Sequence, residues 1–208
     1  LIQQGKVIDR LLESVVANSK IKLDDMLVGD KNALMLGTRI LGYGSEYKVI
    51  INDPETNQDV ERVVDLTTLQ HKEMDKKLFE SGENKFEFEL PNSKRKVEFK
   101  LLTGHDEKII DKQLEDLQKV EELTGVSSEL TTRIKHQLIS VDGNTEQAFI
   151  DNFVDNEFLA LDTRAYRKYV ASITPDIDLS FDYRTKGTGK EIKVDVPLGV
   201  EFFWPAGE

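Results

Sequence analysis

The chain lacks several features that would each define a function class. It has no cysteine, so disulfides, thiolate metal sites and cysteine nucleophiles are excluded. It also lacks a basic excess: 39 acidic against 28 basic residues give 208 residues a net charge of −11. Duplex nucleic acids and anionic membranes both select basic surfaces, so we expect neither as a partner. No apolar run reaches the length of a transmembrane helix, and no signal-peptide pattern is present.

Aromatic residues are few, yet several gather near the end of the chain. The last apolar cluster is Phe202-Phe203-Trp204-Pro205, which holds the only tryptophan. A large side chain left in water forfeits about 1.5–3 kcal/mol, so the cluster must be buried in its own domain or in a partner. A terminal segment has few contacts unless it docks, and aromatic clusters are typical of interface cores. These four residues are therefore our partner-binding candidates. We expect a chain lacking 202–208 to remain folded.

Alternating apolar and polar residues, the period of a half-buried strand, predict three antiparallel hairpins. Each pair of strands is separated by turn-forming residues such as Asn, Pro or Gly. The predicted pairs are 45–51 with 60–66, 86–90 with 97–101, and 177–183 with 192–196.

Helical spacing of apolar residues predicts the remaining elements. The predicted helices cover 6–18, 30–41, 67–80, 105–123, 127–140, 145–158 and 162–173. We expect Asp30 to cap the second helix and Asp162 or Thr163 to cap the last. Helices and hairpins alternate in blocks without βαβ units, which indicates an α+β fold. The length fits one domain over 1–208, with ribbon-like hairpins at 45–66 and 177–205 and a helical region at 105–173.

The three histidines do not form a recognisable site. His71, His105 and His136 are far apart in sequence, and none has a histidine partner four residues away. His105 opens a predicted helix together with two acidic residues, which are favoured at the positive end of the helix dipole. We therefore expect no metal and no general base at these positions.

A group of carboxylates precedes and enters the last hairpin. Asp178 and Asp182 share the polar face of a predicted strand, and Asp176 lies just before it. Their spacing does not continue into a calcium loop with a closing glutamate. No Gly-x-Ser-x-Gly elbow occurs in the sequence either. These observations favour a solvated strand face, and we expect no enzymatic activity, no metal and no cofactor.

The helical region combines basic and aromatic residues. Its basic residues Arg164, Arg167 and Lys168 would suit a nucleic acid, but the acidity of the chain argues against that function. Its aromatic residues are possible partner anchors, although core positions are the more frequent outcome for such residues. They are Phe149, Phe153, Phe158, Tyr166 and Tyr169.

Six segments, in one order over nearly the whole chain, carry a resemblance to a known family. They are LDDMLVGDKNAL at 23–34, RILGYG at 39–44, LLTG at 101–104, SVDGN at 140–144, YVASITPDIDL at 169–179 and VPLGVEFFWP at 196–205. Together they resemble the baseplate hub subunits and hub-assembly proteins of T4-like contractile-tailed phages. The resemblance also implies an N-terminal extension ahead of Leu1, consistent with a start at leucine.

Many of these relatives look as if they carry a Cys-Pro-x-Cys-Gly knuckle in each of the two terminal hairpins, which together would bind one zinc ion. The four ligand positions align here with Asp53, Thr56, Tyr183 and Lys186. A carboxylate, a hydroxyl, a phenol and an ammonium do not make a zinc site. The resemblance therefore implies a zinc-ribbon-like unit without its metal, in which the two hairpins lie side by side.

The function that the resemblance implies is structural. The chain would be a non-enzymatic virion component of the tail baseplate, at or near the central hub, made in the host cytoplasm. It would contact hub and wedge subunits within a large symmetric hetero-oligomer. An assembly chaperone that leaves the finished virion is the alternative. A cell-envelope hydrolase, which would depend on residues such as Glu121 or Asp176, is a third hypothesis.

Overall fold

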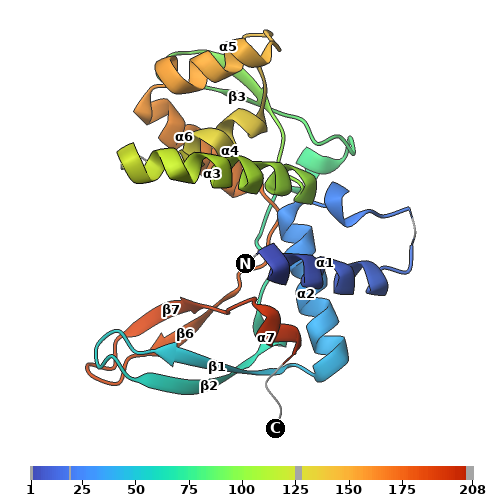
Figure 1. Ribbon diagram of the computed structural model, residues 1–208, viewed down its shortest axis with the longest axis vertical. Helices are drawn as coiled ribbons and strands as arrows, with labels where there is room; N and C mark the ends of the chain where they lie inside the picture. Colours follow the sequence, from blue (N-terminus) through green and yellow to red (C-terminus); the bar gives the residue numbers. More distant parts are fainter. Residues whose placement is uncertain (1, 19, 125–127, 205–208) are drawn as a thin grey trace. The chain divides into compact units, whose positions relative to one another are not determined.

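Helices and small antiparallel sheets alternate along the chain, so the predicted α+β class is confirmed (Figure 1). The structure is a computed structural model that describes residues 2–18, 20–124 and 128–204. The chain divides into two compact units. Unit 1 comprises Leu1–Leu23, Gly29–Lys72 and Pro175–Glu208, and unit 2 comprises Asp24–Val28 and Glu73–Thr174. A single cooperative domain over 1–208 remains a prediction for an unfolding experiment.

Unit 1 joins the two ends of the chain. Its β1–β2 and β6–β7 hairpins each form a two-stranded antiparallel sheet, as the alternation predicted. The two hairpins lie side by side (Figure 1). The elements are α1 (Ile2–Val15), α2 (Val28–Tyr43), β1 (Glu46–Asn52), β2 (Asp59–Asp65), β6 (Ser180–Arg184), β7 (Glu191–Asp195) and α7 (Val200–Phe203).

Burial in unit 1 follows the period of two. In β1 the side chains of Tyr47, Val49 and Ile51 are buried, and the residues between them are exposed. The start of α2 packs against backbone, because a Cβ added at Gly29 would lie 1.8 Å from the carbonyl oxygen of Pro175. Only glycine allows the helix to approach that segment so closely.

The helix predicted over 67–80 is wrong. Only two short 3-10 turns form there, η2 (Leu66–Thr68) and η3 (Lys76–Phe79). Between them the backbone is extended and pairs with the segment before β6: the Lys72 N–H donates to the Asp176 carbonyl at 2.9 Å. The weak helical periodicity of this stretch could not compete with these long-range hydrogen bonds.

Unit 2 packs helices around a three-stranded sheet of order β3-β4-β5. The prediction of a helix over 127–140 is wrong in its last part, because 138–141 forms the strand that pairs with β4. A four-residue apolar run does not distinguish a helix from a strand. The elements are β3 (Phe86–Glu89), β4 (Lys96–Phe99), α3 (Gly104–Thr124), α4 (Glu129–Gln137), β5 (Leu138–Val141), α5 (Gln147–Asn152), the π-helical turn η4 (Phe153–Glu157) and α6 (Ala160–Ile173).

The aromatic residues of the helical region form the core of unit 2. Phe99 of β4 packs edge-to-face against Tyr166 of α6, with ring centroids 5.2 Å apart, and both side chains are fully buried. The five aromatic residues proposed as possible anchors all belong to this core or pack against it. Aromatic pairs of this kind stabilise a core by about 0.5–1.5 kcal/mol beyond their buried area.

Both predicted helix caps are wrong. Asp30 lies inside the first turn of α2, and α6 begins at Ala160, ahead of Asp162. The buried carboxylate of Asp162 instead accepts hydrogen bonds from the N–H groups of Asn92 and Ser93, at 2.7 and 2.9 Å. Burial disfavours its charged form, but these hydrogen bonds prevail and hold the pKa of Asp162 below its ordinary value.

Candidate functional site

A single buried carboxylate joins the tips of the two hairpins of unit 1. Asp53, at the end of β1, has no exposed surface. Its Oδ2 accepts hydrogen bonds from the Tyr183 hydroxyl at 2.6 Å and from the Lys186 N–H at 2.7 Å. Its Oδ1 accepts from the N–H groups of Glu55 and Thr56, both at 2.9 Å. We call Asp53 and these four donors the Asp53 pin.

The hydrogen bonds of the Asp53 pin favour the charged carboxylate. The Tyr183 hydroxyl and then the Lys186 N–H hold the pKa of Asp53 well below its ordinary value. The same bond raises the pKa of the Tyr183 phenol, because the carboxylate stabilises its proton. The four hydrogen bonds therefore favour the charged form of Asp53.

A second carboxylate strengthens the contact. Glu55 accepts hydrogen bonds from the N–H and from the hydroxyl of Thr188, both at 2.6 Å. Gly187 makes room for it, since a Cβ there would lie 2.5 Å from Glu55 Oε2. The prediction that residues 53–57 lie beside 183–187 is thus confirmed.

The residues at the four aligned ligand positions do not fit a zinc ion. The Asp53 carboxylate is fully used by its four donors, and Lys186 contributes its backbone N–H rather than a metal ligand. Within residues 2–18, 20–124 and 128–204, no group of three or more His, Cys, Asp or Glu side chains is placed to hold a metal ion. The two hairpin tips are joined by hydrogen bonds to the Asp53 carboxylate.

The other predicted chemical residues lie apart from one another. His71 pairs through its backbone with Ile177, and the His136 ring lies 2.9 Å from Gln113 Oε1. His105 lies in the first turn of α3, as the sequence predicted. The arrangement brings no two of these histidines into one site.

The carboxylates before the last hairpin have local partners. Asp178 accepts a hydrogen bond from Ser180 and pairs with Lys193 at 3.0 Å, which lowers the pKa of its carboxyl to about 2. Asp176 accepts a hydrogen bond from Asn32, and Asp182 is exposed. The predicted solvated strand face describes Asp182 in β6, whereas Asp178 lies before the strand, which begins at Ser180.

The aromatic tail is divided between core and surface. Phe202 and Phe203 are fully buried, and Phe202 packs edge-to-face on Tyr47 of β1 at a centroid distance of 5.0 Å. Trp204 is 44% exposed. Pro205 lies outside the described residues. Because two of its aromatic rings are buried in unit 1, removal of the tail would expose part of that core, which argues against the expectation that a chain lacking 202–208 stays folded.

Arg39, near the end of α2, is a buried cation that no sequence pattern predicted. It is 5% exposed, and its guanidinium carbon lies 4.8, 5.6 and 5.9 Å from the ring centroids of Tyr43, Tyr47 and Phe202. Its one hydrogen bond among the described residues is a long one, 3.4 Å, to the Gly44 carbonyl. Its Nε is buried without a partner. A buried charge needs an anionic partner, and no ion pair joins Arg39 to a carboxylate of the described residues.

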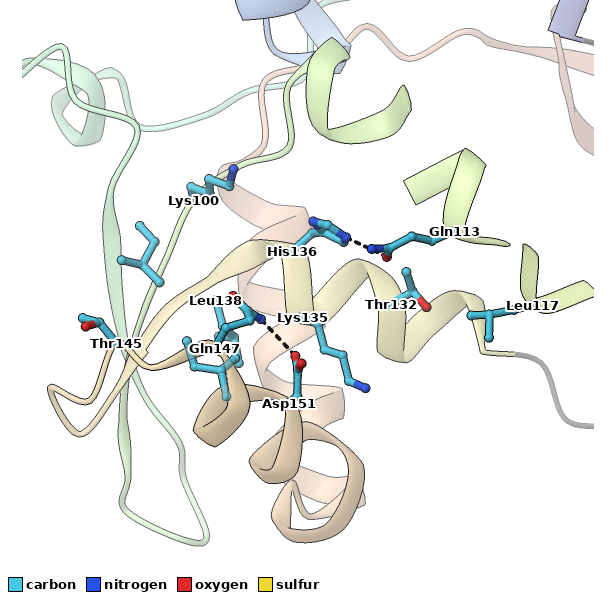
Figure 2. A pocket seen from close by; sticks show the side chains of 12 residues that line it. Lys100, Gln113, Leu117, Thr132, Lys135, His136, Leu138, Thr145, Gln147 and Asp151 are labelled. Atoms are coloured by element: carbon cyan, nitrogen blue, oxygen red, sulfur yellow. Dashed lines mark hydrogen bonds between the residues drawn. The ribbon is translucent and has the colours of Figure 1, made fainter. Parts of the chain in front are cut away.

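Unit 2 contains a hollow of about 610 Å³ between α3, α4, β5 and α5 (Figure 2). Its polar wall residues are engaged with neighbours: His136 with Gln113, Gln147 with Asp151 at 2.9 Å, and Lys135 with Asp155 at 2.7 Å. No nucleophile and base face each other among the side chains drawn in Figure 2.

The polar clusters described above join segments of the fold within each unit. Comparison with known families shows to which family the chain belongs. The model of the T4 bacteriophage base plate protein family matches residues 2–204, so the chain belongs to that family. No curated protein and no solved structure matches the chain. No helix in the described ranges is long and apolar enough to cross a membrane.

Membership of this family supports a structural role in a phage baseplate and interaction with other baseplate proteins. It also suggests a location in the tail baseplate. The family match does not distinguish a hub subunit from other baseplate components.

Proposed function

We propose that the chain is a non-enzymatic structural component of the contractile tail, at or near the central hub of the baseplate. The observation that carries this proposal is the family match over residues 2–204, together with the hub-like segments of the sequence. The chain acts by burying surface against hub and wedge subunits within a symmetric hetero-oligomer. It is made in the host cytoplasm and then assembled into the tail.

Trp204 is the contact residue that the geometry favours. Of the aromatic tail residues that the structure describes, Trp204 alone keeps a large exposed surface, whereas Phe202 and Phe203 are buried in the core of unit 1. Tryptophan is also among the residues that most often dominate interface energies. A stable specific contact buries on the order of 1,200 Å² or more in total, so neighbouring surface must take part as well.

Mass spectrometry of purified virions tests the proposal. We expect the chain in finished tails at a fixed ratio to other baseplate proteins. Its presence in assembly intermediates and absence from finished virions would indicate the alternative role, an assembly chaperone for the hub. Detection in neither would contradict both roles.

A further inference from the structure

The strongest unexplained feature of the molecule is the cation at Arg39. A guanidinium carries five N–H donors, yet Arg39 forms one long hydrogen bond to a described residue and no ion pair. Buried polar groups are nearly always satisfied, so such a group requires an explanation. Three aromatic rings surround it and compensate its charge in part.

Next to this cation, unit 1 exposes apolar side chains. Tyr43, four residues after Arg39 and on the same face of α2, is 54% exposed. Phe202 connects the Arg39 cage to the end of the chain, where Phe203 and Trp204 are in ring contact at 6.2 Å. An arginine that forms no ion pair with a described carboxylate therefore lies beside a partly exposed aromatic rim, Tyr43 and Trp204.

We propose that Arg39 and this rim form a binding site for a carboxylate-bearing apolar segment of another baseplate protein. The inference rests on the proposed baseplate function. The carboxylate, from an Asp, a Glu or a chain terminus, accepts hydrogen bonds from the guanidinium after Tyr43 turns aside. Apolar residues beside the carboxylate cover Tyr43 and Trp204. Charge complementarity selects this occupant, because a basic or neutral segment would leave the buried cation without an anion.

The first experiment separates binding from folding. Full-length Arg39→Met keeps an unbranched apolar side chain and removes the charge. Since Arg39 has no anion in the free protein, we expect the Tm to remain within a few degrees of wild type. In a phage that depends on this gene, we expect at least a tenfold loss of the variant from purified tails. Arg39→Lys, which keeps charge but loses the planar fork, is expected to restore incorporation in part.

The matched control is Arg62→Met. Arg62 also stacks on an aromatic ring, with its guanidinium carbon 5.3 Å from the Tyr183 centroid, but it is exposed. It should enter tails like wild type. Normal incorporation of Arg39→Met would overturn the inference. So would a large fall in its Tm together with its loss from tails, because Arg39 would then serve only the fold.

The second experiment identifies the occupant. Tyr43→p-benzoylphenylalanine is assembled into tails and photo-crosslinked, and the crosslinked peptide is sequenced. We expect a peptide of a different tail protein with a carboxylate within about three residues of the crosslink. Neutralising that carboxylate should reduce incorporation as Arg39→Met does, with no further loss in the double variant. A crosslink to a second copy of this chain, or to a segment without a carboxylate, contradicts the inference. Absence of the wild-type chain from tails contradicts instead the proposed function.

Discussion

The two units achieve order by different means. Unit 2 buries large aromatic and aliphatic side chains around a three-stranded sheet drawn mainly from one continuous stretch, 73–174. Unit 1 has only two-stranded sheets, which are marginal by themselves, and collects them from distant parts of the chain. It joins their tips with the Asp53 pin and closes its core with Phe202 and Phe203. The difference teaches that two small hairpins without a large core can be held together by one fully hydrogen-bonded carboxylate and by two buried aromatic rings.

The largest expected effect tests the aromatic core of unit 2. Phe99→Ala removes a fully buried ring that packs on Phe86 and Tyr166. We expect the free energy of unfolding to fall by about 3–5 kcal/mol, because a buried cavity replaces the ring. Chemical denaturation followed by circular dichroism measures it. Leu161→Ala, at a 65% exposed position, is the control and should change stability by about 0.5 kcal/mol or less. A loss below about 1 kcal/mol for Phe99→Ala would refute this view of the core.

The next effect tests whether the chain end belongs to unit 1. Phe202→Ala should lower the free energy of unfolding by about 3 kcal/mol, since the ring is fully buried against Tyr47 and Phe203. Trp204→Ala should cost about 1 kcal/mol or less in the free protein, because much of its surface is already in water. If both substitutions lowered the free energy of unfolding by equal, small amounts, the whole tail would instead be a partner-binding segment.

A smaller effect is expected from the Asp53 pin. Asp53→Asn replaces the carboxylate by an amide, whose NH2 group cannot accept hydrogen bonds from the N–H and O–H donors that converge there. The Tm should therefore fall at neutral pH, though less than for Phe202→Ala. The folded-state pKa of Asp53 is lowered, so its stabilising contribution is present above its ordinary pKa of 3.8 and is lost as the pH falls below that value. The difference in Tm between wild type and variant should therefore shrink in acid. Asp182→Asn, on the exposed face of β6, is the control. A difference that grows in acid would contradict the direction of the pKa shift.

No effect at all is expected from metal removal. Because Asp53 and its donors join the hairpin tips without a metal, the Tm should be unchanged in excess EDTA. Thermal unfolding with and without chelator, together with elemental analysis, measures this. A clear drop in Tm, or about one zinc per chain, would show that the tips of unit 1 are held by a metal after all.

Where sequence reasoning went wrong, local patterns were overridden by contacts between distant segments. Residues 138–141 continue a helical pattern, yet they complete the sheet beside β4 because that position buries Leu138 and Val141. Asp162 has the position of a helix cap, yet its carboxylate serves the turn at Asn92 and Ser93, about 70 residues away. Arg39 lies in one of the segments that resemble the baseplate family, but its local sequence pattern did not predict that its side chain would be buried.

By itself the sequence determined the periodic elements, the α+β class, the absence of thiolate chemistry and the family-like segments. These are properties of composition and of spacing along the chain, which the sequence states directly. Only the tertiary structure decided that Tyr183 donates to a carboxylate 130 residues away. It also decided that Phe202 and Phe203 belong to the core while Trp204 is exposed. The same holds for Arg39, which is buried and forms no ion pair with a described carboxylate. Such outcomes depend on which distant segments meet, and burial and hydrogen bonding are assigned only when they do.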